Sequence, residues 1–164
     1  MIIYYLDASA WVKRYYRETG TVWVQDLFFQ NPLMACANLG FIEVAATLAR
    51  KRKADEIDTI QHDQKQSELE SDWENFIQIQ CSEKVISKAI DLAKSYALRG
   101  ADAIHLASAL HLYGLFSFSE HQLIVVTSDI ELKEAAQAAG LNVVDPNDHQ
   151  ESEQTNTNAQ QGPS

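Results

Sequence analysis

Four acidic residues border or interrupt apolar stretches of the sequence, where solubility does not explain them. They are Asp7, Glu43, Asp102 and Asp129. An unpaired carboxylate in such surroundings is costly to bury, so we expect a cation to offset the charge. Carboxylate oxygens from distant segments are the ligands that Mg²⁺ and Mn²⁺ prefer. The pattern therefore predicts a metal site.

Each acid also has a purely structural interpretation. Asp102 and Asp129 lie near the starts of helix-like segments, where free backbone amides and the helix dipole favour aspartate. Asp7 could be a turn residue after a strand, and Glu43 could be paired or reach solvent along its stem. The four together favour a shared site. One or two divalent ions there would polarise a phosphate and activate water, which predicts phosphodiester hydrolysis.

Other reaction classes lose support because their motifs do not occur in the sequence. We find no G-x-x-x-x-G-K-[ST] loop, no G-x-G-x-x-G fingerprint, no C-x-x-C pair and no G-x-S-x-G elbow. Cys36 and Cys81 lie in apolar, strand-like contexts, so we expect free buried thiols rather than a disulfide. Nucleotide-cofactor, redox and serine-hydrolase chemistry are thereby disfavoured.

Apolar runs alternate with helix-like segments, which predicts an α/β domain with a central, mostly parallel sheet flanked by helices. We expect strands at residues 2–6, 33–37, 76–81, 123–127 and 141–144, the third of them at a sheet edge. We expect helices at residues 8–16, 21–30, 38–51, a segment ending at Trp73, 83–99, 101–112 and 130–139. Asp7 and Asp129 each follow a strand, at the edge that holds active sites in open α/β sheets.

One domain is expected over residues 1–146, followed by a disordered polar tail at 147–164. The chain has 164 residues and 46% hydrophobic content, enough for one substantial core. The tail has no large apolar residue and cannot offset its ordering entropy. There is no apolar segment of about 18 residues and no secretory signal pattern, which predicts a cytoplasmic protein without membrane contacts.

The formal net charge of −10 argues against broad electrostatic attraction to nucleic acid. The four proposed ligands carry part of that charge, so local basic groups matter more than the sum. Candidates for contacts with phosphates are Lys13, Arg14, Arg17, the cluster at residues 50–53, and Arg99 close before Asp102.

Four segments around the acids have a characteristic order and spacing. They are YLDASAWVK at residues 5–13, FIEV at 41–44, LRGADAIHLA at 98–107 and VTSD at 126–129. Together they resemble the PIN-domain nucleases, and among these the VapC-type ribonuclease toxins of type II toxin–antitoxin systems. The resemblance covers residues 1–146 and implies a PIN-like three-layer fold.

The resemblance also implies the activity: an endoribonuclease that uses Mg²⁺ or Mn²⁺ to hydrolyse RNA. Its catalytic, metal-binding acids correspond to Asp7, Glu43, Asp102 and Asp129. Ser9 matches a hydroxyl position that supports the ligands, Thr127 matches a position near the last acid, and Arg99 is a candidate for contact with substrate. The implied protein partners are a second copy of the chain, forming a homodimer, and an antitoxin whose C-terminal segment crosses the cleft.

Some interpretations remain open at this stage. His105 follows Asp102 by one helical turn, but its apolar neighbours Ile104 and Leu106 favour a packing role. A catalytically inactive PIN-like module that binds RNA or protein is the main alternative to a nuclease. A phosphatase that forms an aspartyl phosphate on Asp7 is a weaker one, because no second acid stands two residues later.

Overall fold

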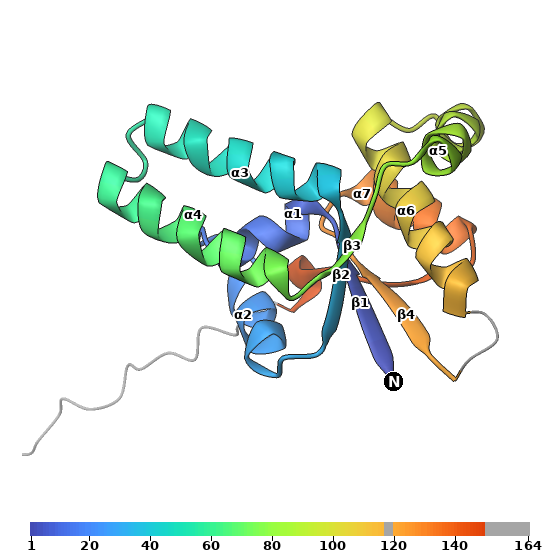
Figure 1. Cartoon of the computed structure of the whole chain (residues 1–164), viewed down its shortest axis with the longest axis horizontal. Coiled ribbons are helices and arrows are strands. Elements are labelled where there is room, and N and C mark those ends of the chain that lie inside the picture. Colours follow the sequence, from blue (N-terminus) through green and yellow to red (C-terminus); the bar gives the residue numbers. More distant parts are fainter. Residues whose placement is uncertain (117–119, 150–164) are drawn as a thin grey trace, which may run out of the picture.

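A five-stranded sheet forms the centre of the computed structural model, which describes residues 1–116 and 120–149 (Figure 1). Its strands are β1 (Ile2–Leu6), β2 (Leu33–Ala37), β3 (Ile77–Ile79), β4 (Gln122–Val126) and β5 (Asn142–Val144). The order is β3-β2-β1-β4-β5, and all four pairings of neighbours are parallel. The predicted parallel sheet is confirmed, and β3 lies at an edge as expected.

Helices cover both faces of the sheet. They are α1 (Ala8–Trp11), the 3₁₀ turn η1 (Val12–Arg14), α2 (Thr21–Phe29), α3 (Asn38–Lys53), α4 (Thr59–Glu74), α5 (Glu83–Tyr96), α6 (Gly100–Phe116), α7 (Ile130–Ala138) and the 3₁₀ turn η2 (Pro146–Asp148). In Figure 1, α1 to α4 lie on one side of the sheet and α5 to α7 on the other. This is the predicted three-layer α/β fold.

Each face of the sheet has its own apolar core. Aromatic rings fill the α1–α4 side, where Trp11 stacks on Phe76 with 4.6 Å between ring centroids. Aliphatic side chains such as Leu106 and Leu112 of α6 fill the α5–α7 side. The strands that face both cores are apolar on both faces, as buried parallel strands must be.

The helix predicted at residues 8–16 is wrong in its second half. The α-helix ends at Trp11 and tightens into η1. Tyr15 then turns inward, where its hydroxyl accepts a hydrogen bond from Trp11 Nε1 at 2.9 Å and donates to Asp72 of α4 at 2.6 Å. These tertiary contacts override the local helical pattern.

Helices α3 and α4 project from the sheet as a helical arm (Figure 1). Asp58 caps α4 with a capping box to Gln61, and Leu69 is fully buried in the apolar core of the α1–α4 side. Ile60, although apolar, is 80% exposed. It lies in the first turn of α4, at the tip of the arm and away from the core.

The last described segment extends slightly beyond the predicted domain end, because η2 includes Asn147 and Asp148. Residues 150–164 of the predicted polar tail lie outside the described residues. Of the helices in the described part of the chain, none is long and apolar enough to cross a membrane.

Candidate metal and active site

Proposed site residues meet at the carboxyl ends of the two central strands. Asp7 directly follows β1, and Thr127 directly follows the neighbouring β4. From β1 the chain continues to β2 on one side, while β4 pairs on the other, so this edge is a topological switch point. Such points are where open α/β sheets bind ligands.

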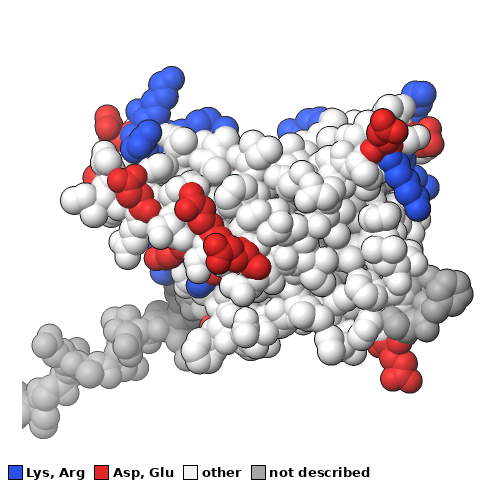
Figure 2. Space-filling view, in the orientation of Figure 1, with Lys and Arg blue, Asp and Glu red and all other residues white. Residues whose placement is uncertain are grey.

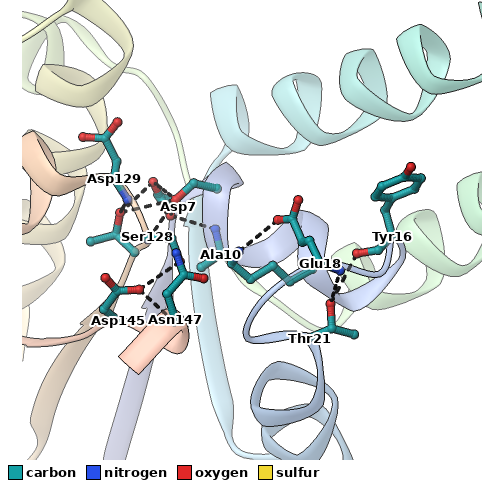
Figure 3. A network of polar contacts seen from close by, with 12 residues as sticks. Asp7, Ala10, Tyr16, Glu18, Thr21, Ser128, Asp129, Asp145 and Asn147 are labelled. Carbon is teal, nitrogen blue, oxygen red and sulfur yellow. Dashed lines mark hydrogen bonds and ion pairs between the residues drawn. The ribbon is translucent and has the colours of Figure 1, made fainter. Parts of the chain in front are cut away.

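Asp7 is only 3% exposed, and three donor groups hold its carboxylate (Figure 3). Ser9 Oγ lies 2.8 and 2.9 Å from its two oxygens, Thr127 Oγ1 donates to Oδ2 at 2.9 Å, and the Ala10 amide donates to Oδ1 at 3.1 Å. Burial nevertheless raises the pKa of Asp7, although the charge of His105 and these donors oppose the rise. Its carboxylate is fixed in place but under-compensated in charge.

A short loop after β4 fixes Asp129. Oδ1 of Asp129 caps α7 by accepting a hydrogen bond from the Leu132 amide at 2.9 Å, which confirms the capping interpretation. Its own amide donates to Thr127 Oγ1 at 3.1 Å, and the Ser128 amide donates to Ser9 Oγ at 3.0 Å. Thr127 thus joins Asp7 to Asp129, while Asp129 Oδ2 remains available to other groups.

Arg99 links the carboxylate of Asp102 to that of Asp129. Its Nε donates to Asp102 Oδ2 at 3.2 Å, and its Nη2 donates to Asp129 Oδ2 at 2.9 Å. The Arg99 side chain is 72% exposed, whereas those of Asp102 and Asp129 are 10% and 21% exposed. Burial and the nearby charge of Asp129 raise the pKa of Asp102, and the Arg99 charge opposes that rise. The guanidinium is therefore an exposed counter-charge for two acids.

Glu43 has a partner that the sequence pattern did not reveal. His105 Nε2 lies 2.6 Å from Glu43 Oε1, and its Nδ1 lies 3.0 Å from the hydroxyl of Tyr5. Burial would lower the pKa of His105, but the Glu43 hydrogen bond and the charge of Asp7 raise it overall. His105 is packed in the core, as its apolar neighbours indicated, but its ring also serves an acid of the site. In the sequence, the sign that His105 could lie near the site was its position one helical turn after Asp102.

The donor set matches a hard divalent cation in type, because all four acids offer oxygen. Within residues 1–116 and 120–149, however, no three Asp, Glu, His or Cys side chains are close enough to hold one ion as arranged. Arg99 already places positive charge between two of the acids. The residues therefore match Mg²⁺ or Mn²⁺ in chemical type, but the acids would have to move closer together, and Arg99 to withdraw, before they could share one ion.

Two of the basic residues predicted to face phosphates are used elsewhere. Lys13 is buried and bonds Glu18 at 3.0 Å, and Arg14 pairs with Asp72 at 3.2 Å. The cluster at residues 50–53 forms the last turn of α3. Figure 2 shows its charges at the far end of the helical arm, away from the sheet. Of the candidates, Arg99 is the one in direct contact with the acids.

Comparison with known proteins gives one consistent family. The PIN domain family model matches residues 4–138. The chain is 36% identical over 150 residues to ribonuclease VapC45 of Mycobacterium tuberculosis (strain CDC 1551 / Oshkosh), covering 87% of this chain and 95% of that protein.

Solved structures share the fold. VapBC2 from Rickettsia felis, bound to a DNA fragment from its promoter, aligns with a TM-score of 0.60 and 17% identity over 87% of this chain and 98% of that chain. A toxin–antitoxin complex from Klebsiella pneumoniae aligns with a TM-score of 0.57 and 21% identity over 87% and 96%.

Proposed function

The chain belongs to the PIN-domain family and is a VapC-type ribonuclease within it, and we propose that it is a Mg²⁺- or Mn²⁺-dependent endoribonuclease that acts as the toxin of a toxin–antitoxin pair. Its substrate is RNA, whose phosphodiester bonds it hydrolyses at the acidic edge of the sheet. The proposal assigns ligand roles to the four acids Asp7, Glu43, Asp102 and Asp129.

One observation carries the proposal: three of the acids, from separate elements, are joined into one polar network at one sheet edge, and part of their charge is balanced by the exposed Arg99 side chain. Asp7 and Asp129 share Thr127 as a hydrogen-bond partner, and Arg99 joins Asp129 to Asp102. Burying such acids is unfavourable for folding alone. A bound cation would offset that cost and so account for the buried acids.

The residues of the chain have distinct roles in the proposed reaction. When bound, the divalent ion supplies Lewis acidity toward the phosphate and lowers the pKa of the attacking water. Ser9 and Thr127 hold Asp7 in one orientation through hydroxyl donors. No protein nucleophile is needed.

Arg99 has a second role in this proposal. If Asp102 and Asp129 held a divalent ion, the Arg99 guanidinium, which is exposed, would no longer be needed to balance their charge. A guanidinium matches the geometry of a phosphate and can bind it through two parallel hydrogen bonds. We assign Arg99 to a phosphate of the bound RNA.

A protein partner suits the rim of the site. Ile42 adjoins Glu43 and is 61% exposed, and Ile130 adjoins Asp129 and is 69% exposed. Exposed apolar groups beside acids suit an antitoxin segment that covers the cleft and places a basic side chain among the carboxylates. We propose an antitoxin as this partner, a homodimer as the toxin assembly and the cytoplasm as its location.

An inactive binding module is the second candidate, and the arrangement around Arg99 favours it. If the guanidinium stays between Asp102 and Asp129, the acids are neutralised without a metal ion. Such a chain would keep the fold and the RNA- or protein-binding surface but would not cut RNA.

The test is cleavage of total RNA by the purified full-length chain, freed of any bound antitoxin, with Mg²⁺ or Mn²⁺. Discrete fragments that disappear in EDTA and in Asp7→Asn support the proposal. Asp91→Asn, which changes an exposed aspartate of α5, is the matched control and should cut normally. No cleavage with either metal favours the binding module, and release of inorganic phosphate from small phosphomonoesters favours a phosphatase.

A further inference from the structure

We infer that His105 is a positioning residue that holds the Glu43 carboxylate toward the cation site, with Tyr5 and the end of β2 as its anchor. The inference rests on the proposed function, because it assigns His105 to the service of a proposed metal ligand. His105 is then part of the proposed site and not only a side chain of the core.

The contacts form a continuous chain from the sheet to the acid. The Ala37 amide, at the end of β2, donates to the Tyr5 hydroxyl at 3.3 Å. The Tyr5 oxygen lies 3.0 Å from His105 Nδ1, and His105 Nε2 lies 2.6 Å from Glu43 Oε1. Strands β1 and β2 and helix α6 therefore combine to hold one side chain of α3.

The direction of each hydrogen bond follows from the carboxylate. An ionised carboxylate only accepts hydrogen bonds, so Nε2 of His105 must carry the hydrogen that faces Glu43. In the neutral ring Nδ1 is then an acceptor, and the Tyr5 hydroxyl donates to it. In a histidine that binds metal directly, a second hydrogen-bond partner fixes the tautomer in the same way. Here His105 is not the ligand itself but donates to the proposed ligand, Glu43.

The packing around the ring is shaped for this contact. His105 is 2% exposed, and the rings of Tyr5 and His105 meet edge to face with 6.0 Å between centroids. Gly40 of α3 leaves the necessary room, since a Cβ there would lie 3.1 Å from His105 Cε1 and would also collide with Cys36. Helix α3 can approach the ring closely, which brings Glu43 into hydrogen-bonding range.

Exposure explains why Glu43 requires such a partner. Its side chain is 32% exposed and belongs to a long, flexible residue type that loses rotamer freedom when it is fixed. Asp7, by contrast, is short, buried and enclosed by donors from α1 and from Thr127. A buried, immobile imidazole supplies the orientation that Glu43 lacks by itself.

The first test is the tautomer of His105 in the full-length chain in EDTA, read from long-range ¹H–¹⁵N NMR correlations. The structure predicts hydrogen on Nε2. An imidazole with hydrogen on Nδ1 alone would overturn the inference, because it could not donate to Glu43. This measurement needs neither metal nor RNA.

The second test is Mn²⁺ binding by calorimetry with His105→Leu and His105→Gln. Loss of a partner behind a metal ligand weakens metal affinity by about 10–100-fold, so we expect that loss in His105→Leu. His105→Gln keeps an N–H donor and should bind Mn²⁺ more tightly than His105→Leu does. His111→Leu, on the same helix but facing the α5–α6 groove, is the matched control and should bind like wild type.

The outcomes separate the inference from the proposed function. Wild-type affinity in both His105 variants, or equal weakening in the His111 control, overturns the role of His105. If the His105→Leu chain does not fold, Tyr5→Phe removes the anchor and should weaken Mn²⁺ binding while His105 remains. Tight Mn²⁺ binding that depends on His105, in a wild type that cuts no RNA, upholds the inference and refutes the nuclease.

Discussion

The four acids of the site divide into two pairs that are held in different ways. Asp7 and Glu43, the preorganised pair, accept hydrogen bonds from the buried side chains of Thr127 and His105, and Asp7 also accepts one from the Ala10 amide in α1. Asp102 and Asp129, the arginine-bridged pair, share the exposed guanidinium of Arg99. In the proposed metal site, one half is therefore already oriented by buried donors, and the other half already has a positive charge beside it.

This difference shows two ways in which the protein accommodates the negative charge of these carboxylates. A hydroxyl or amide donor orients a carboxylate but leaves its charge, whereas a guanidinium neutralises that charge and, in the proposed function, would be displaced when a metal ion binds. The preorganised pair should therefore determine whether metal binds, and the arginine-bridged pair should adjust how tightly. Four predictions test this division.

The largest effect is expected from Asp7→Asn, which removes the charge of the most deeply buried acid. We predict a loss of RNA cleavage of at least about 10³-fold, since an electrostatic contribution at the reacting centre is lost. The melting temperature in EDTA should not fall, because burial raises the pKa of Asp7 and the ionised carboxylate opposes folding. A large drop in melting temperature in EDTA would show that Asp7 is chiefly structural.

Thr127→Val should produce the next largest effect. The substitution preserves shape but removes the hydroxyl that donates to Asp7 and accepts from the Asp129 amide. We expect Mn²⁺ affinity to weaken by about 10–100-fold and the free energy of unfolding to fall by about 1–3 kcal/mol. Thr127→Ser keeps the hydroxyl and is the control. Equal losses in Val and Ser variants would mean that packing at this site, rather than hydrogen bonding, is decisive.

Arg99→Gln should act in the opposite direction on metal binding. Exposed ion pairs are weak, so removing these two should tighten Mn²⁺ binding by only roughly 2- to 30-fold. The KM for RNA should rise, because the phosphate contact is lost, while Arg99→Lys should be intermediate in both measurements. Weaker Mn²⁺ binding in Arg99→Gln would refute the idea that Arg99 competes with the ion.

The smallest effect concerns pH and stability. Burial raises the pKa values of Asp7 and Asp102 in the folded chain. Acids of this kind favour folding when protonated, below their ordinary pKa, and this contribution is lost as the pH rises through their folded pKa. Stabilisation by Mn²⁺ should consequently be greater near neutral pH than at about pH 5.

Calorimetry or thermal melts with and without Mn²⁺ measure this difference. An ion at 100 times its Kd stabilises the folded state by about 2.7 kcal/mol, which corresponds to a rise of several degrees in melting temperature. An equal rise in melting temperature at both pH values would show that Mn²⁺ binding does not depend on ionisation of the buried acids.

Much of the fold was accessible from the sequence because its signals are local. The apolar runs at residues 2–6 and 33–37 became β1 and β2, and the alternating segment near Ile77 became an edge strand. The segment at 8–16 was predicted poorly, because the inward turn of Tyr15 depends on Asp72, which is 57 residues away. Tertiary contacts of this kind leave no local pattern.

In the candidate site, too, local signals were predictable from the sequence and tertiary contacts were not. Asp7 and Asp129 were expected to meet because each follows a strand, and parallel strands bring their carboxyl ends to one edge. The hydrogen bond from His105 to Glu43 joins residues 62 positions apart and could not be derived from spacing. Arg99 was a candidate because it closely precedes Asp102 in the sequence, but its bridge to Asp129 required the three-dimensional structure.

A crystal structure of the full-length chain soaked with Mn²⁺, with the ion located by anomalous diffraction, tests the central claim most directly. The account predicts anomalous density among the four acids, with Asp7 and Glu43 close to their present positions and the Arg99 guanidinium withdrawn from Asp102 and Asp129. Arg99 still bridging both acids at saturating Mn²⁺, with no anomalous density at the sheet edge, would contradict it.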